Sequence, residues 1–350
     1  MDMKRDYRED IRLFPSNVVK VWFFLLIAFL VLLPLFTKGY IVYNLNLILI
    51  NVIVALGMNI LVGYTGQISL GHAGFFAIGA YASALIMTRL HLPFVFALPA
   101  SGLIAAAFGF LLGLPALRLK GPYLVIATMG FGMAIIQIIG HWEGFFGGHM
   151  GIITPKISFG PFELNTDRQL YYLIMTVTVG MTIAAINIIK SRIGRAFIAI
   201  RDSDIAAETI GVNLTHYKTL AFAVSAFYTG IGGSLMGFVL GFINPQNFNF
   251  FLSISFLAMV VVGGLGSILG SILGAILITI LQIQLNNIPE IPLLGKGVVF
   301  LSQGWFSMSG IANVSSIIFG LILIIIIIFE PLGLWGRWLK IKYYWKKWPF

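Results

Sequence analysis

The chain alternates between long runs of apolar residues and short polar segments. A membrane-spanning helix needs about 20 mostly apolar residues, and the pattern predicts one such helix for each run before residue 190. The first run follows a basic segment, but no small-residue cleavage site comes after it, which favours an uncleaved span over a signal peptide. The six runs, none of which contains Asp, Glu, Lys or Arg, are 21–36, 41–62, 69–88, 93–117, 123–140 and 170–189.

The second half of the chain is almost free of charge. Residues 219–289 contain no charged residue and no histidine. Residues 219–242 predict one helix, which ends before the sequence Asn244-Pro245, and residues 314–329 predict the last span. Residues 248–285 fit either one long helix or two shorter helices divided at the glycine-rich sequence 263–267.

The distribution of Lys and Arg favours the divided form. Division gives ten spans, with 17 of the 22 Lys and Arg residues on the side of both termini, whereas an undivided helix gives 13 against nine. Because basic residues concentrate in cytoplasmic loops, we expect about ten transmembrane helices with both termini in the cytoplasm. The first piece of the divided helix, 253–262, is then a short helix of the kind that transport proteins place beside their pathway.

This topology divides the chain into three parts. Residues 1–20 form a cytoplasmic N-terminal segment, 21–336 the transmembrane domain and 337–350 a basic cytoplasmic tail. Within the domain, residues 190–218 form a cytoplasmic loop and residues 141–169 an extracytoplasmic loop.

Composition strengthens the prediction of an all-α polytopic membrane protein. Apolar residues make up 59% of the chain and charged residues only 10%, against about 25% charged residues in soluble domains. The net charge of +10 comes from residues at the ends of spans. Membrane lipid is therefore the expected environment and nucleic acid is not an expected partner. The absence of cysteine excludes disulfides and thiolate metal sites.

The sequence Gly63–Gly74 concentrates glycine, hydroxyl groups, an amide and a histidine between two hydrophobic runs. One interpretation is an irregular segment that lines a pathway, because backbone groups freed from a helix must face protein or water. The other is a tight cytoplasmic turn that enters a closely packed helix. The residue pattern leaves both open.

Three asparagines share one face of the second span, because Asn44, Asn51 and Asn59 are seven and eight residues apart. Amides are costly in hydrocarbon unless they are paired, so we expect this face to point into the bundle. The amides then either bond between helices or contact a passing solute. The predicted pathway residues are Asn51, Asn59, Gln67, Ser69 and His72.

Several possible chemistries have no support in the sequence. The repeat of Gly266, Gly270 and Gly274 is typical of a small-residue face that packs against another helix. No Walker A pattern, which would indicate nucleotide binding, occurs in the sequence. His141, Glu143 and His149 lack helical zinc spacing. No carboxylate lies inside a span, which weakens proton-coupled transport. We therefore assign no catalytic residue and no metal ligand.

The cytoplasmic loop contains a short amphipathic helix. Asp202, Ser203 and Asp204 form a favourable helix start, and Gly211 is a favourable stop. Such a helix either lies in the membrane interface or fits a groove in a partner protein, and its low aromatic content favours the groove.

Five blocks together resemble the permeases of ABC importers for branched-chain amino acids, and the M-type subunit more than the H-type. The resemblance covers most of the chain, although Met133-Ala134 replace an acidic residue that often follows Phe131-Gly132 in the family. The blocks are GYTGQISLGHAGFFAIGAY at 63–81, LRLKGPYLVIATMGFG at 117–132, and residues 194–213, 262–267 and 329–334.

This resemblance implies a permease subunit in the cell inner membrane, crossing it many times. The subunit would form a heterodimer with an H-type permease and work with two cytoplasmic ABC ATPases and an extracytoplasmic substrate-binding protein. ATP and Mg²⁺ would bind the ATPases, so this chain would bind no cofactor and would not itself be an enzyme. Substrate would pass from the binding protein to the cytoplasm.

Other functions remain as alternatives. Urea and amide permeases of the same class carry similar blocks, and an ATP-independent secondary transporter would need no ATPase. The loop that resembles an ATPase-coupling segment counts against the latter. The residues that the resemblance assigns to ATPase coupling are Arg195, Asp202, Asp204, Ile205, Ala206, Glu208 and Gly211.

Overall fold

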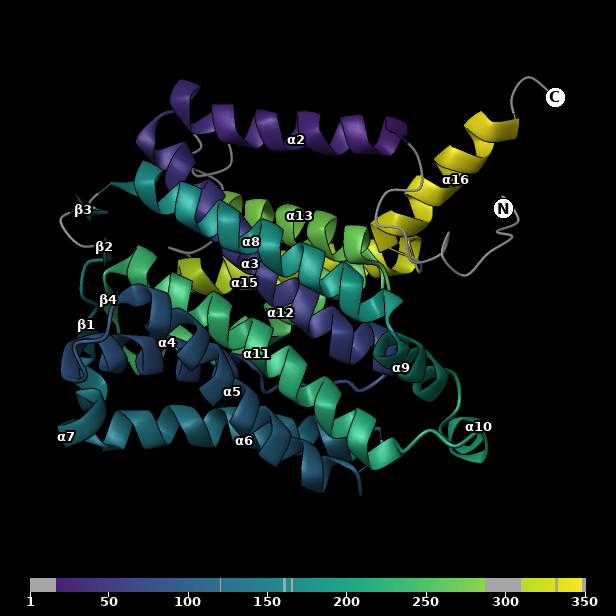
Figure 1. Ribbon diagram of the computed structural model, residues 1–350, viewed down its shortest axis with the longest axis horizontal. Coiled ribbons are helices and arrows are strands. Elements are labelled where there is room, and N and C mark those ends of the chain that lie inside the picture. The colour runs from purple at the N-terminus through teal and green to yellow at the C-terminus, as the bar shows by residue number, and fades with distance from the viewer. Residues whose placement is uncertain are drawn as a thin grey trace.

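The protein is a bundle of helices whose axes run mainly in one direction (Figure 1). The computed structural model describes residues 17–119, 121–159, 162–164, 166–286, 310–330 and 333–347. Most of the predicted N-terminal segment 1–20 lies outside the described residues, as do residues 287–309. The long helices are α2 (Asn17–Phe36), α3 (Gly39–Thr65), α4 (His72–Arg89), α5 (Phe94–Ala116), α6 (Pro122–His141), α8 (Asp167–Lys190), α11 (Leu214–Leu240), α12 (Phe250–Gly263), α13 (Ile268–Asn286), α15 (Gly310–Phe329) and α16 (Gly333–Lys347).

The helices identify an all-α protein that crosses the membrane several times. Within the described residues, seven helical stretches are long and apolar enough to span a bilayer. These are Gly39–Thr65, Phe94–Ala116, Pro122–His141, Asp167–Lys190, Leu214–Leu240, Pro245–Gly263 and Ile268–Leu285. The other three predicted spans are also helical, as α2, α4 and α15. The count of ten crossings stays a prediction.

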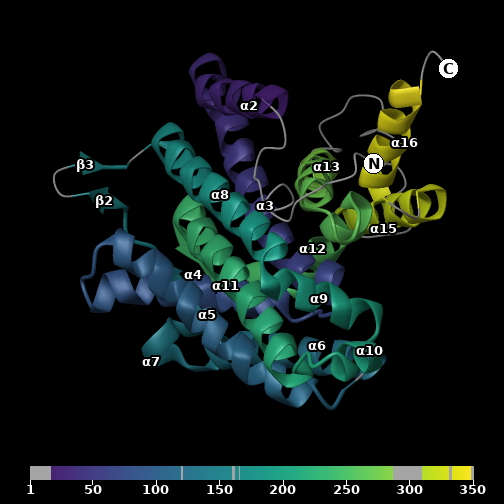
Figure 2. The ribbon, with the colours of Figure 1, turned by 45° about the vertical axis from the view of Figure 1, so that its right-hand side comes forward.

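Helix α11 is the centre of the first half of the bundle. It packs against α3, α4 and α5, which surround it in both views of the ribbon (Figures 1 and 2). Glycines allow the closest approaches, because a Cβ at Gly79 of α4 would overlap the carbonyl oxygen of Gly230 in α11. A Cβ at Gly233 would likewise overlap the carbonyl oxygen of Phe76. Close backbone packing of this kind is how helices associate within a bilayer.

The predicted division of the second half is confirmed. Helices α12 and α13 are separate and pack against each other. Gly270 and Gly274 of α13 lie directly against the α12 backbone at Gly263 and Met259, as the predicted packing face requires. Gly266 does not take part in that face, because it lies in the turn between the helices with a φ of 73°. The first piece, α12, is longer at both ends than the predicted 253–262, and the short helix η2 (Pro245–Phe248) precedes it.

The loops gather at the two ends of the bundle. The short helices α9 (Arg192–Asp202) and α10 (Asp204–Thr209) lie at the same end as α16 and the start of α2 (Figure 1). The predicted tail 337–350 is largely the helix α16. At the other end lie α7 (Glu143–Phe146), η1 (Gly148–Met150), β1 (Ile152–Ile153), β2 (Ser158–Phe159), β3 (Phe162–Glu163) and β4 (Phe242–Ile243).

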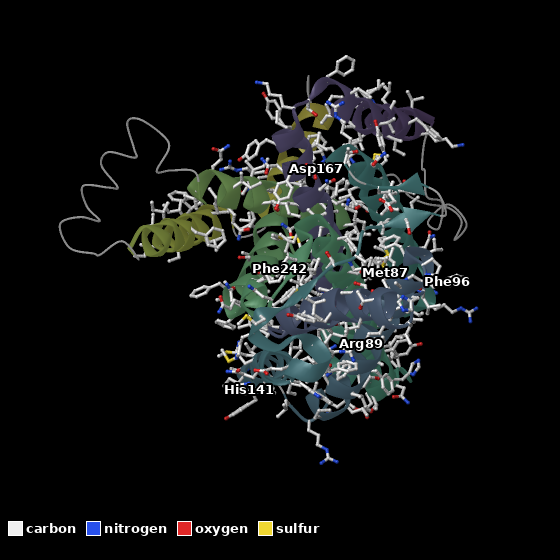
Figure 3. All side chains as sticks on the ribbon, turned by 90° about the vertical axis from the view of Figure 1, so that its left-hand side faces the viewer. Met87, Arg89, Phe96, His141, Asp167 and Phe242 are labelled. Carbon is white, nitrogen blue, oxygen red and sulfur yellow. The ribbon has the colours of Figure 1, made fainter. Side chains whose placement is uncertain are left out.

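The first part of the loop, residues 141–154, is folded onto the bundle, whereas β2 and β3 project from it (Figure 2). Strand β1 pairs antiparallel with β4, and Ile152 lies opposite Ile243. The Arg89 guanidinium donates to the Gly144 and Phe145 carbonyls at 2.8 and 3.0 Å. Figure 3 looks onto this end of the molecule and labels Arg89, His141 and Phe242.

The contact between α4 and α11 generates a stability prediction. We expect Gly79→Ala to destabilise the protein by about 1–3 kcal/mol, because the added methyl group must displace the Gly230 backbone. The measurement is the thermal midpoint of the purified protein in detergent. The matched control is Gly180→Ala on α8, where nothing lies within 4 Å of the new Cβ. Equal midpoints for the two variants would contradict this packing.

Candidate functional site: two helix breaks and a coupling segment

The segment Gly66–Gly71 is a non-helical stretch between α3 and α4, and we call it the first break. Its side chains alternate in exposure. Gln67 and Ser69 are buried, whereas Ile68 is 46% exposed. Residues 67 and 69 thus face the protein interior, whereas residue 68 faces away from it. The predicted span 69–88 therefore begins as a helix only at His72.

Side chains from two other helices bind the backbone around the first break. The Leu70 amide donates to Thr128 Oγ1 of α6 at 3.1 Å. The Ala73 amide, in the first turn of α4, donates to Ser253 Oγ of α12 at 2.9 Å. Backbone groups outside a helix need such partners within a membrane protein. Thr128 and Ser253 were missed by sequence reasoning, because a single hydroxyl in an apolar helix carries no local signal.

Glycines bring the first break against α6. A Cβ at Gly71 would overlap the carbonyl oxygen of Thr128, and a Cβ at Gly74 would lie 2.9 Å from the Gly132 Cα. The glycine-rich blocks 63–81 and 117–132 of the sequence are therefore in direct contact. Their shared richness in glycine follows from the close approach of two backbones.

His72 is fully buried at the start of α4. Its Nε2 shares a hydrogen bond of 2.8 Å with Ser225 Oγ of α11, and its ring meets the edge of Phe75. Within the described residues its Nδ1 has no hydrogen-bond partner. Gln67 donates to Thr65 Oγ1 at 3.2 Å. Both polar side chains thus serve contacts inside the protein in this conformation.

The residues Gly264–Ser267 form the second break, between α12 and α13. Asn59 of α3 binds it with both ends of its amide. The Gly266 N–H donates to Asn59 Oδ1 at 2.9 Å, and Asn59 Nδ2 donates to the Ser267 carbonyl at 3.0 Å. Gly264 and Gly266 have φ values of 117° and 73°, which glycine adopts without strain.

The prediction that the asparagine face points into the bundle is confirmed at two positions. Asn59 is 1% exposed, and Asn51 donates to Thr279 Oγ1 of α13 at 2.9 Å. Sequence reasoning missed Asn46, which is fully buried and donates to the Asp167 carbonyl at 3.2 Å. Asn46 is five residues from Asn51, which lies outside the spacing used for the helical face.

The predicted coupling segment, residues 192–211 and called the coupling segment below, forms two helices. Ser203 ends α9 and begins α10, where its hydroxyl accepts from the Ala206 amide at 3.3 Å. Gly211 follows with a φ of 88°. The predicted helix start at 202–204 and the predicted stop are therefore both confirmed. The second helix is anchored to α11, because Lys218 Nζ lies 2.7 Å from Asp204 Oδ2.

Most of the predicted coupling residues on α10 face away from the bundle, whereas Asp204 faces Lys218 of α11. Ile205 and Ile210 are 76% and 75% exposed, and Ala206 and Glu208 are also exposed. Ala207, which is 1% exposed, lies on the side of α10 that faces the bundle. Helix α9 is anchored by its buried Phe197 and Ile200. The segment thus presents apolar side chains outward from a fixed base.

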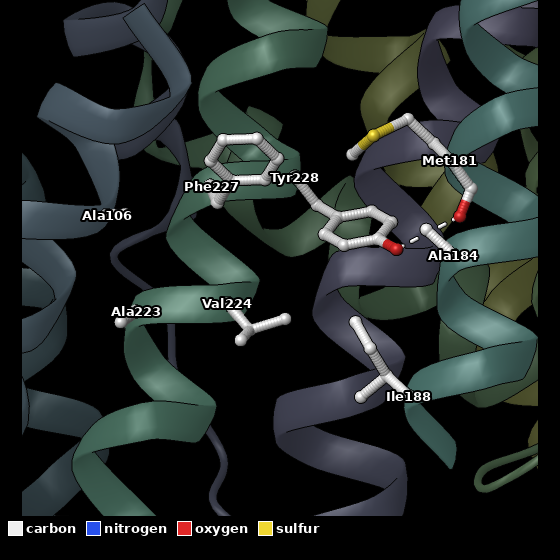
Figure 4. Close-up of a pocket in the computed structure, with 8 residues that line it drawn as sticks. All are labelled: Ala106, Met181, Ala184, Ile188, Ala223, Val224, Phe227 and Tyr228. Atoms are coloured by element: carbon white, nitrogen blue, oxygen red, sulfur yellow. Dashed lines mark hydrogen bonds between the residues drawn. The ribbon is translucent and has the colours of Figure 1, made fainter. Parts of the chain in front are cut away.

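A groove of about 270 Å³ lies between α5, α8 and α11 (Figure 4). It is lined by Ala106, Met181, Ala184, Ile188, Ala223, Val224, Phe227 and Tyr228. The Tyr228 hydroxyl donates to the Met181 carbonyl at 3.0 Å, so its polar end is already bonded. The groove contains none of the predicted pathway residues. Within the described ranges, no three His, Asp or Glu side chains are placed to hold a metal ion.

Comparison with known proteins identifies a transport family. Residues 40–327 match the sequence model of the family described as branched-chain amino acid transport system / permease component. The chain is 37% identical over 243 residues to the high-affinity branched-chain amino acid transport system permease protein LivM of Salmonella typhimurium, covering 63% of this chain and 57% of that protein. No solved structure matches the chain.

Two further relatives sharpen the comparison. LivM of Escherichia coli strain K12 is 37% identical over 246 residues, which cover 63% of this chain and 58% of the relative. LivH of Salmonella typhimurium is 25% identical over 234 residues, which cover 62% of this chain and 75% of the relative. The resemblance to the M-type is therefore confirmed over that to the H-type. The chain covers less than three fifths of the length of either LivM protein.

The second break generates a prediction about Asn59. We expect Asn59→Leu to cost about 1–3 kcal/mol, because the Gly266 N–H loses its acceptor, whereas the Ser267 carbonyl keeps its bonds from the Ser271 amide and hydroxyl. The thermal midpoint of the purified protein measures this loss. Asn51→Leu is the matched control. It removes one bond, and the Thr279 hydroxyl keeps its own bond to the Ala275 carbonyl. A larger loss in the control would contradict the role of Asn59.

Proposed function

Because this chain belongs to the family of branched-chain amino acid transport permease components, we propose that it is the M-type membrane subunit of an ATP-driven importer for branched-chain amino acids. The match across residues 40–327, with 37% identity to LivM, carries this proposal. Substrate would enter from an extracytoplasmic binding protein and leave into the cytoplasm. The chain would act as a conduit in the inner membrane, and ATP hydrolysis would belong to its partners.

The proposed assembly contains an H-type permease, two cytoplasmic ATPases and the binding protein. We place α9, α10 and both termini on the cytoplasmic side, with ten crossings between them. The gathering of α9, α10, α16 and the start of α2 at one end of the bundle supports this topology (Figure 1). The 17-to-five distribution of basic residues supports it independently.

We propose that the first break lines the transport pathway. Its inner edge is held by the protein, and its outer edge, with Ile68 46% exposed, is left uncovered by this chain. Irregular backbone at membrane depth is tolerated only against protein or water, so a partner subunit or a water-filled path must cover this edge. The pathway residues Asn51, Asn59, Gln67, Ser69 and His72 would then support the two breaks and contact solute when the breaks move.

Uptake into reconstituted vesicles tests the function. We expect leucine uptake that requires ATP, both permeases, the ATPases and the binding protein. Urea is the comparison substrate, because urea and amide permeases carry similar sequence blocks. Uptake of urea without uptake of leucine would indicate that the protein is a urea or amide permease. Uptake of leucine without ATP would contradict an ATP-driven mechanism in favour of secondary transport.

Helix α10 tests the proposed contact with the ATPase. Ala206 is exposed beside Ile205, so Ala206→Trp places a large side chain in the proposed contact surface. Overpacking costs about 1–3 kcal/mol, which corresponds to roughly tenfold weaker binding or more. We expect the variant to insert normally and to lose the ATPase on purification, or to hydrolyse ATP without uptake.

The control for this variant is Ala107→Trp, an equally bulky change at an exposed position on α5. This control should retain the ATPase. Normal co-purification and uptake in Ala206→Trp would show that α10 lies in the lipid interface instead of a protein groove.

A further inference from the structure

Arg201, in the last turn of α9, reaches from the coupling segment to the end of a membrane helix. Its Nη1 donates to the Gly63 carbonyl of α3 at 3.1 Å. Its Nε and Nη2 donate to Asp202 Oδ1 at 3.2 and 3.1 Å. The contact with Asp202 therefore orients the guanidinium group, and the contact with Gly63 joins it to α3. Sequence reasoning did not include Arg201 among the coupling residues.

The Gly63 carbonyl is available because α3 ends two residues later. The Gly66 amide bonds the Val62 carbonyl and the Gln67 amide bonds the Leu61 carbonyl, so the chain leaves the helix without using the carbonyl of Gly63. The last carbonyls of a helix need partners from outside its own ladder. Arg201 supplies one with a charged donor, and hydrogen bonds from charged groups are the stronger kind.

Arg201 also lies against both breaks. A Cβ at Gly266, in the second break, would be 2.9 Å from Arg201 Nη1. A Cβ at Gly66, in the first break, would be 3.4 Å from Arg201 Cγ. A Cβ at Gly63 would overlap Asn59 Oδ1 and lie close to the Gly266 amide. The Gly63 carbonyl and Gly266 therefore lie against the guanidinium group of Arg201, and Gly66 lies against its aliphatic stem.

We propose that Arg201 is the positioning residue that transmits movement of the coupling segment to both helix breaks. The inference rests on the proposed function, in which α10 contacts the ATPase. The apolar contacts of α9 through Phe197 and Ile200 fix its distance from the bundle but have no preferred direction. The Arg201 bond is directional, so displacement of α9 along the membrane surface acts on the end of α3 and on the breaks beside it.

The test uses the complete complex in vesicles, with binding protein and leucine, and measures leucine uptake per ATP hydrolysed. We expect Arg201→Gln to assemble and hydrolyse ATP while uptake per ATP falls about tenfold, the size of effect expected from losing one charged hydrogen bond. Arg201→Lys keeps a cationic donor toward Gly63 and should recover most of this ratio. The control is Arg118→Gln, which removes a charge from an exposed position outside the coupling segment.

A purely structural role gives a different result. If Arg201 only caps α3, uptake and hydrolysis fall together in Arg201→Gln, their ratio stays constant, and the proposal is overturned. A wild-type complex that takes up no leucine overturns the proposed function first, and this inference with it. A normal wild type with an unchanged ratio in Arg201→Gln overturns this inference alone.

A second measurement does not depend on whether Arg201→Gln assembles. The natural chain has no cysteine, so spin labels can be placed at Ile68 and Leu265, which are 46% and 53% exposed in the two breaks. We expect the distance between the labels to change when the otherwise wild-type complex is trapped with ATP and vanadate. An unchanged distance in a complex active in transport overturns the proposal.

Discussion

The need to pair every backbone polar group inside the bilayer governs this structure. Two stretches, Gly66–Gly71 and Gly264–Ser267, leave the helical ladder, and their amides and carbonyls need partners from outside the helices. Several of the released groups are bonded by side chains from helices distant in sequence, such as Thr128, Ser253 and Asn59. The helices that supply these side chains are thereby fixed in position. The breaks organise the bundle around them.

Close packing of small residues provides the second constraint. The core forms where α11 approaches α4 and α5 with little more than backbone between them, as at Gly79 and Gly230. Hydrophobic burial cannot drive this association among lipid tails, so complementary surfaces and bonded polar groups have to supply it. Polar bonds and glycine contacts occur together at the first break, where Gly71 and Leu70 both meet Thr128.

The sequence allowed the helices, the division at 263–267 and the coupling helix to be predicted, because each depends on local patterns of hydrophobicity, glycine and capping residues. The inward direction of Asn51 and Asn59 followed from spacing alone. The hydrogen-bond partners of these residues could not be predicted from spacing. Ser267 is 208 positions from Asn59, and Arg201 is 138 positions from Gly63. Pairing over such separations is decided by tertiary packing, which a single sequence does not encode in any local pattern.

Helix α11 is attached at both of its ends. Near one end, Lys218 binds Asp204 of the coupling segment, and near the other the Gly237 carbonyl accepts from the Thr154 hydroxyl of the loop that pairs with β4. The two attachments are 19 residues apart, about 29 Å along a helix axis, which matches the thickness of the hydrocarbon core. One stiff rod therefore joins the two faces of the membrane, and a tilt imposed at either face has to appear at the other.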